Sequence, residues 1–128
     1  MKLTSSIISL VAFFSFAAGD MVEVSHNAKY DIGASSMGTV SCSSYLGPKY
    51  PTFGNLPTNK IGGRYSVNCG SCWQLGYNHK IVYALAIDGS TEGSFQLSQS
   101  AMDALGGQKE KYQVSISPAS PAKCGLSV

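Results

Sequence analysis

The sequence is short of charge, of tryptophan and of long apolar runs, and each shortage argues against a class of protein. Only 12% of the residues are charged, and nine Lys and Arg face seven Asp and Glu. Such a balance provides no clustered basic face for nucleic acid. No apolar run reaches the roughly 20 residues that a membrane-spanning helix needs. Two histidines and the lack of a Gly-x-Ser-x-Gly motif argue against a serine-hydrolase triad.

The first nineteen residues have the pattern of a secretory signal peptide. Lys2 supplies the positive start, residues 7–16 are mainly apolar, and Ala17, Ala18 and Gly19 are the small residues that a signal peptidase needs. We expect cleavage after Gly19. The signal peptide is then residues 1–19, and residues 20–128 form one secreted domain with a charge of about +1.

Four cysteines, Cys42, Cys69, Cys72 and Cys124, all lie in the secreted part. An even number of cysteines in a small exported chain favours two disulfides, and reasoning from the residues leaves three pairings open. The motif Cys69-Gly-Ser-Cys72 also fits a thioredoxin-like dithiol, but the sequence after it has a strand pattern and supplies no helix to lower a thiol pKa. A zinc site would need further ligands, and no histidine has metal-ligand spacing. Structural bridging is therefore favoured, and no metal or cofactor is expected.

Several segments alternate apolar and polar residues as strands do. The strongest pattern, residues 80–88, is apolar on both faces, which predicts a strand buried on both faces that ends at Asp88. Residues 72–77 are its expected hairpin partner, with Asn78 and His79 in the turn. Further strands are predicted at residues 21–25, 37–42 and 111–117.

The remaining segments predict a loop, a helix and a fastened tail. Residues 47–63 contain many glycines and prolines and are expected to form a long ordered loop. Ser98 is placed to cap a short helix over residues 99–105, which Gly106 ends. Several short strands with one helix indicate a mainly β fold, a closed or nearly closed small barrel.

The acidic residues allow a hydrolytic alternative. A glycosidase normally needs two facing carboxylates, and Asp88, with Asp31 as the second, is the pair that the sequence offers. The competing interpretation of Asp88 is structural, because a carboxylate beside Gly89 can accept hydrogen bonds from loop amides.

Tyrosines are the expected platform for a sugar ring. Tyr45, Tyr50 and Tyr65 lie in loop-like segments where exposure is expected, whereas Trp73 and Tyr83 are expected to pack in the core.

Motifs throughout the secreted part resemble the cerato-platanin family in order and spacing. The most specific are Asn68-Cys69-Gly70-Ser71-Cys72-Trp73 and Cys124-Gly125-Leu126. The others are Cys42-Ser43, Tyr50-Pro51-Thr52-Phe53-Gly54, Ile61-Gly62-Gly63, Ala86-Ile87-Asp88, Gly93-Ser94-Phe95 and Ala101-Met102-Asp103-Ala104-Leu105. The resemblance implies a six-stranded double-psi β-barrel, as in expansins and barwin, with one or two short helices. It also implies the disulfides Cys42 to Cys69 and Cys72 to Cys124.

The resemblance further implies a non-catalytic fungal protein of the extracellular space and cell wall. Its expected partners are chitin or N-acetylglucosamine oligomers, with cellulose and a host receptor as further candidates. Its expected effects are wall loosening and elicitation of host defence. The alternatives are a weak polysaccharide hydrolase using Asp88 and Asp31, or a surface-active host-interaction protein that binds no sugar. By motif, the groove residues are Tyr50, Asn68, Gly70, Ser71, Asp88, Ser90 and Gln96.

Two segments depart from the family pattern. Ser43-Ser44-Tyr45-Leu46-Gly47 replaces the usual Asn-Gly-rich loop, and the segment Arg64-Tyr65-Ser66-Val67-Asn68 is shortened and lacks the family's tryptophan. We therefore expect one wall of the groove to differ in shape.

Overall fold

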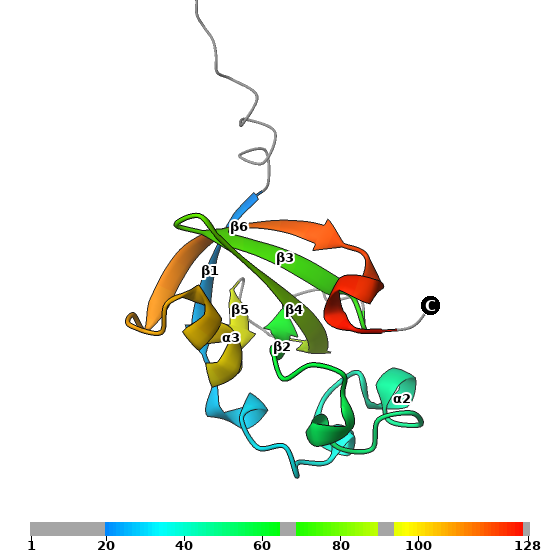
Figure 1. Cartoon of the computed structure of the whole chain (residues 1–128). Coiled ribbons are helices and arrows are strands. Elements are labelled where there is room, and N and C mark those ends of the chain that lie inside the picture. The colour runs from blue at the N-terminus through cyan, green and yellow to red at the C-terminus, as the bar shows by residue number, and fades with distance from the viewer. Residues whose placement is uncertain (1–19, 65–68, 90–93, 127–128) are drawn as a thin grey trace, which may run out of the picture.

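Six strands close into a barrel in the computed structural model, which describes residues 20–64, 69–89 and 94–126 (Figure 1). The predicted signal peptide, residues 1–19, lies outside the described residues. Around the barrel the strand order is β1-β5-β2-β4-β3-β6. The strands are β1 Asp20–His26, β2 Ile61–Arg64, β3 Cys72–Tyr77, β4 Lys80–Gly89, β5 Phe95–Leu97 and β6 Lys111–Ala119. The prediction of a small closed β-barrel is confirmed.

The hairpin β3–β4 forms where the sequence predicts it. Tyr77 pairs with Lys80 across a two-residue turn, and both turn residues, Asn78 and His79, have positive φ angles of 49° and 68°. Two consecutive positive φ angles define the turn type whose twist suits a two-residue hairpin, and asparagine tolerates that conformation well.

β4 has an apolar face toward each of two hydrophobic cores. Ala84 and Ala86 point into the barrel, and Leu85 and Ile87 point into a second core outside it; all four are fully buried. The prediction of a strand buried on both faces is confirmed for this part. It is wrong at the start of β4, where Ile81 is 56% exposed because the hairpin tip extends beyond both cores.

The barrel core contains Val24, Phe95, Leu97 and Val114, and one helix, α3 Gln99–Leu105, packs on it. α3 begins as predicted: the Ser98 hydroxyl accepts a hydrogen bond from the amide of Ala101, and Gly106 ends the helix. N-caps of this kind satisfy backbone amides that lack partners within the helix.

The second core lies under the segment between β1 and β2, which we call the loop unit (residues 27–60). It consists of short turns and one helical turn: η1 Ala28–Tyr30, η2 Met37–Thr39, α2 Ser43–Leu46 and η3 Phe53–Asn55. Met37, Phe53 and Leu46 pack against Ile87 of β4 and Ile61 of β2 in this loop core.

Two local predictions are wrong in this region. Residues 37–42 do not form a strand, because the Ser36 hydroxyl accepts from the amide of Gly38 and starts a 3₁₀ turn. The predicted loop over residues 47–63 ends early, since Ile61 begins β2. Glycine at position 63 is compatible with this strand because the Tyr30 side chain approaches the backbone closely there.

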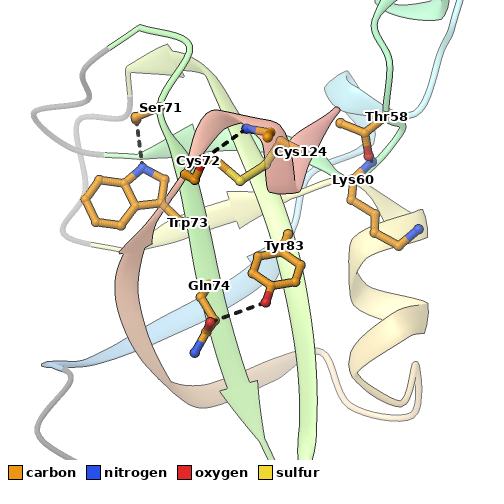
Figure 2. The surroundings of a disulfide bond; sticks show 10 residues. Thr58, Lys60, Ser71, Cys72, Trp73, Gln74, Tyr83 and Cys124 are labelled. Carbon is orange, nitrogen blue, oxygen red and sulfur yellow. Dashed lines mark hydrogen bonds between the residues drawn. A yellow bond between two sulfur atoms is a disulfide. The ribbon is translucent and has the colours of Figure 1, made fainter. Parts of the chain in front are cut away.

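Two disulfides hold the loop unit and the C-terminal segment to the barrel. They join Cys42 to Cys69 and Cys72 to Cys124, which confirms the pairing implied by the resemblance. The second bridge links β3 to the final turn η4 Pro121–Cys124 (Figure 2). Within the described ranges, no helix is both long and apolar enough to cross a membrane.

Candidate functional site

A row of three residues crosses β5, β2 and β4 on the outside of the barrel. Gly63 of β2 is in register with Gln96 of β5 on one side and with Asp88 of β4 on the other. We call this row the Asp88 strip. Neighbouring strands are about 4.8 Å apart, so the backbones of Gln96 and Asp88 are roughly 10 Å apart across the glycine.

A β-bulge turns Asp88 onto this face. Gly62 pairs with Ala86 but Gly63 pairs with Asp88, so Ile87 and Asp88 together span one step of β2. Simple alternation along β4 would place Asp88 on the inner face with Ala84 and Ala86. The extra residue re-aims the carboxylate outward, which is a recurring use of bulges near functional sites.

Three groups from the loop unit hold the Asp88 carboxylate. Its Oδ1 accepts from the Ser41 amide at 2.9 Å, and its Oδ2 accepts from the Tyr30 hydroxyl at 2.9 Å and from Lys29 Nζ at 3.0 Å. The residue is only 6% exposed. Burial raises the pKa of Asp88, but the hydrogen bonds from Ser41, Lys29 and Tyr30 together lower it more, so its net pKa lies below the ordinary value. Asp88 is therefore ionised at neutral pH.

The Tyr30 hydroxyl reaches Asp88 by crossing directly over Gly63. A Cβ on Gly63 would collide with this hydroxyl, which explains why the position needs glycine. Burial, followed by the neighbouring Asp88 charge, raises the pKa of Tyr30 above its ordinary value. Tyr30 thus stays protonated and remains a donor to the carboxylate.

Gln96 lies at the other end of the strip beside a polar hollow. Its side-chain oxygen accepts from Asn27 Nδ2 at 2.9 Å. The hollow, about 640 Å³, lies between β1, β5 and the start of β6, and its lining includes the amide side chains of Gln96, Gln99 and Gln108. Amides provide both donors and acceptors, and the same lining contains two acids, Glu23 and Glu110, and two lysines, Lys109 and Lys111, so this end of the strip offers polar groups of both charge signs.

Asp31 has a structural position beside the start of α3. Its Oδ2 lies 2.6 Å from His26 Nε2, and its Oδ1 accepts from the backbone amide of Gln99 at 2.7 Å. Both carboxylate oxygens are thereby engaged, and Asp31 and Asp88 share no hydrogen-bond partner among the described residues.

The model of the cerato-platanin family matches residues 22–126. The chain belongs to this family. It is 35% identical to allergen Asp f 15 of Aspergillus fumigatus over the whole of both chains. It is 28% identical to a heat-stable 19 kDa antigen of Coccidioides immitis, covering 94% of this chain and 95% of the antigen. The crystal structure of cerato-platanin 1 from M. perniciosa is 38% identical, with a TM-score of 0.74 and coverage of 80% and 98%.

The barrel of this cerato-platanin is thus the double-psi β-barrel of the family, as the resemblance implied. The structure describes five of the seven predicted groove residues. Asp88 and Gln96 share the strip, and Tyr50 and Gly70 line a second hollow beside α2. The Ser71 hydroxyl accepts from Trp73 Nε1 at 2.8 Å (Figure 2). The predicted site residues Asn68 and Ser90 lie outside the described residues.

The aromatic predictions are confirmed only in part. Tyr45 is exposed and Tyr50 is half-buried, while Tyr65 lies outside the described residues. Trp73 and Tyr83 are half-buried at the edges of the two cores, not inside them. The Arg64 guanidinium covers the Trp73 ring, with its Cζ 4.5 Å from the ring centroid.

The sequence reasoning missed Asn27, Lys29, Tyr30 and Gly63 as parts of the site. Asn27 carries a usable signal, since asparagine after a strand favours a turn, and it does cap η1. Nothing local indicates that Lys29 and Tyr30 contact a residue almost sixty positions away.

The Cys-Gly-Ser-Cys motif of this cerato-platanin is divided between two bridges. Cys69 pairs with Cys42 and Cys72 pairs with Cys124, so the two cysteines are not each other's partners as in a dithiol exchange site. In the described part of the chain, no group of three or more His, Cys, Asp or Glu side chains is arranged to hold a metal.

Proposed function

We propose that this cerato-platanin is a secreted, wall-associated protein that binds N-acetylglucosamine oligomers, as in chitin, along the Asp88 strip without cleaving them. The observation that carries the proposal is the register of Gln96, Gly63 and Asp88. The Tyr30 hydroxyl fills the space over Gly63. On either side of it lie two polar pairs, Gln96 with Asn27 and Asp88 with Lys29. Pre-positioned amides and an ammonium group suit the hydroxyl and acetamido groups of such a sugar.

Within this site Asp88 is a positioning residue. Its carboxylate is buried and is already bonded to Ser41, Tyr30 and Lys29. The groups left to contact a ligand are the half-exposed Lys29 ammonium and the Gln96 amide. Asp88 fixes Lys29 and the loop unit in place, and the sugar is bound by their outer surface.

Non-catalytic binding fits the carboxylates better than hydrolysis does. A glycosidase acid must be protonated to donate to the leaving oxygen, whereas hydrogen bonds keep the pKa of Asp88 low and the group ionised. Asp31 already binds His26 and caps Gln99. Chitin and cellulose oligomers incubated with the protein should therefore yield no new reducing ends.

A surface-active role without sugar binding has less support. The exposed large apolar residues Met21, Ile32, Tyr45 and Ile81 come from four different segments. Single exposed apolar residues are normal on soluble domains. The allergen and antigen names of the relatives, and the secretory pattern of residues 1–19, support an extracellular protein that meets a host. Wall loosening and elicitation of host defence belong to the same proposal.

A titration with chitin tetramer tests the binding site. Backbone amides of Lys29, Gly63, Asp88 and Gln96 should shift, and Gln96→Ala should weaken binding about three- to tenfold because one side-chain hydrogen bond is lost. Gln113→Ala, an exposed glutamine on β6, is the matched control and should bind like wild type. Unchanged spectra at millimolar tetramer would refute the proposal.

A further inference from the structure

A second hollow, about 310 Å³ in volume, lies beside α2 and shares no lining residue with the hollow at Gln96. We call it the tyrosine pocket. α2 and the C-terminal turn η4 lie on the same side of the barrel (Figure 1). The pocket lies between these two elements. Its lining is Tyr45, Leu46, Lys49, Tyr50, Gly70, Pro121 and Leu126.

Tyr45 provides an exposed aromatic ring at this pocket. It is 66% exposed, the largest exposed fraction among the large apolar residues of the described chain. The ring lies against Gly70, where φ is +78° and an added Cβ would come within 2.6 Å of the ring. Because Gly70 has no side chain, the Tyr45 ring packs directly on the backbone beside the Cys42–Cys69 bridge. A ring that is held by the backbone on one side and exposed to solvent is suited to pack against the apolar face of a ligand.

Lys49 is the one charged residue among the described residues that line the pocket. Between Ile32 and Ile87 the sequence contains four basic residues, Lys49, Lys60, Arg64 and Lys80, and no acid. Lys49 Nζ lies 5.6 Å from the centroid of the Tyr50 ring. Among the residues that the structure describes, no carboxylate is within ion-pair distance of Lys49. The pocket therefore offers an unneutralised ammonium group next to an aromatic surface.

We infer that the tyrosine pocket binds a sugar unit that carries a carboxylate, a hexuronate of an acidic polysaccharide. The ring of the sugar packs against Tyr45, and the carboxylate pairs with the Lys49 ammonium. A neutral sugar would leave this exposed ammonium bonded to water only, whereas a carboxylate would pair with it, and the described lining contains no acid that would repel an anion. Tyr45 belongs to the segment that departs from the family pattern, whereas Tyr50 and Gly70 are groove residues implied by the resemblance, so the exposed Tyr45 ring is what the departing segment adds to the pocket. The inference does not rest on chitin binding at the strip.

The test is an amide-shift titration of the secreted domain with a galacturonic acid tetramer, with chitin tetramer added to a parallel sample. The acidic tetramer should shift Tyr45, Lys49, Gly70 and Leu126. Tyr45→Ala should weaken its binding about three- to tenfold, and Tyr45→Phe should not, because the ring is retained. Lys49→Gln should weaken binding and remove most of its salt dependence between about 0.05 and 0.3 M NaCl.

Lys80→Gln, an exposed lysine at the start of β4, is the matched control for Lys49→Gln. Equal weakening by both variants would mean general attraction to a basic surface and would overturn the inference. Unshifted pocket amides, or equal binding of the chitin tetramer at the pocket, would also overturn it. Since the strip and the pocket contain different amides, failure of one site is distinguishable from failure of the other.

Discussion

The barrel and the loop unit are built in different ways, although β4 contributes to both of their cores. In the barrel every strand pairs with two neighbours, so the backbone ladder closes on itself. In the loop unit the backbone bonds are mostly short turns, such as Leu56 to Phe53, with one isolated bridge between Ser36 and Thr52. The barrel can therefore rely on its ladder, whereas the loop unit relies on packing, a disulfide and the Asp88 carboxylate.

This difference explains why the proposed functional residues lie where the two parts meet. Asp88 and Gln96 come from barrel strands, and the groups that bond to them, including Lys29 and Asn27, come from the loop unit. A rigid sheet sets the positions of the strip, and the loop unit adds side chains that a strand could not supply. Loosening the loop unit should then damage the strip before it damages the barrel.

The largest expected effect on stability comes from removing the Cys42–Cys69 bridge in the double variant Cys42→Ala, Cys69→Ala. The bridge spans 27 positions, and loss of such a crosslink costs about 3 to 4 kcal/mol in the chain-entropy model. Denaturant unfolding should show this loss. Hydrogen exchange should show amides of the loop unit opening while β3 and β6 amides stay protected; equal opening of both would contradict a separately held loop unit.

A smaller difference is expected from matched leucine truncations in the two cores. Leu97→Ala in the barrel should cost about 3 kcal/mol, and Leu46→Ala in the loop core about 2 kcal/mol. Both side chains are buried, but the turns around Leu46 can collapse into the cavity more easily than paired strands can. Urea unfolding of the two variants measures the difference. A larger loss from Leu46→Ala would show that the loop core is packed as rigidly as the barrel.

The same contrast decides what the sequence could predict. Alternation indicated β1, β4 and β6, and local signals indicated the Asn78–His79 turn and the Ser98 cap, because each depends on neighbouring residues. The loop unit has no periodic signal. β2 was hidden by Gly62 and Gly63, whose suitability for a strand depends on distant residues: the Gln96 carbonyl lies against Gly62, and the Tyr30 hydroxyl lies against Gly63.

The candidate site shows the same limit. Asp88 could be identified as a strand-end carboxylate, and the structural interpretation of it, a bond to a loop amide, is confirmed by Ser41. The bulge at Ile87 and Asp88 could not be foreseen, because it depends on the register with β2. Long-range pairing therefore determines which face of the sheet the carboxylate occupies.

The smallest expected effect concerns Asp88 itself. Its contribution to holding the loop unit on the barrel should depend on pH. Because the folded pKa of Asp88 is lowered, its ionised form stabilises the fold above its unfolded pKa of about 3.9, and this contribution is lost as pH falls through the folded value. Asp88→Asn keeps the shape but removes the charge, so it should cost about 1 kcal/mol at pH 6. The difference from wild type should shrink steadily toward pH 2.5.

Urea midpoints of both proteins between pH 2.5 and 6 measure this convergence. Asp103→Asn, an exposed carboxylate on α3, is the control and should follow the wild-type pH profile. Hydrogen exchange of the Ser41 amide adds a local readout, since this amide donates to Asp88 Oδ1 and should lose protection in Asp88→Asn while β6 amides keep theirs. A constant difference across the pH range would mean that the carboxylate's charge does not hold the loop unit to the barrel.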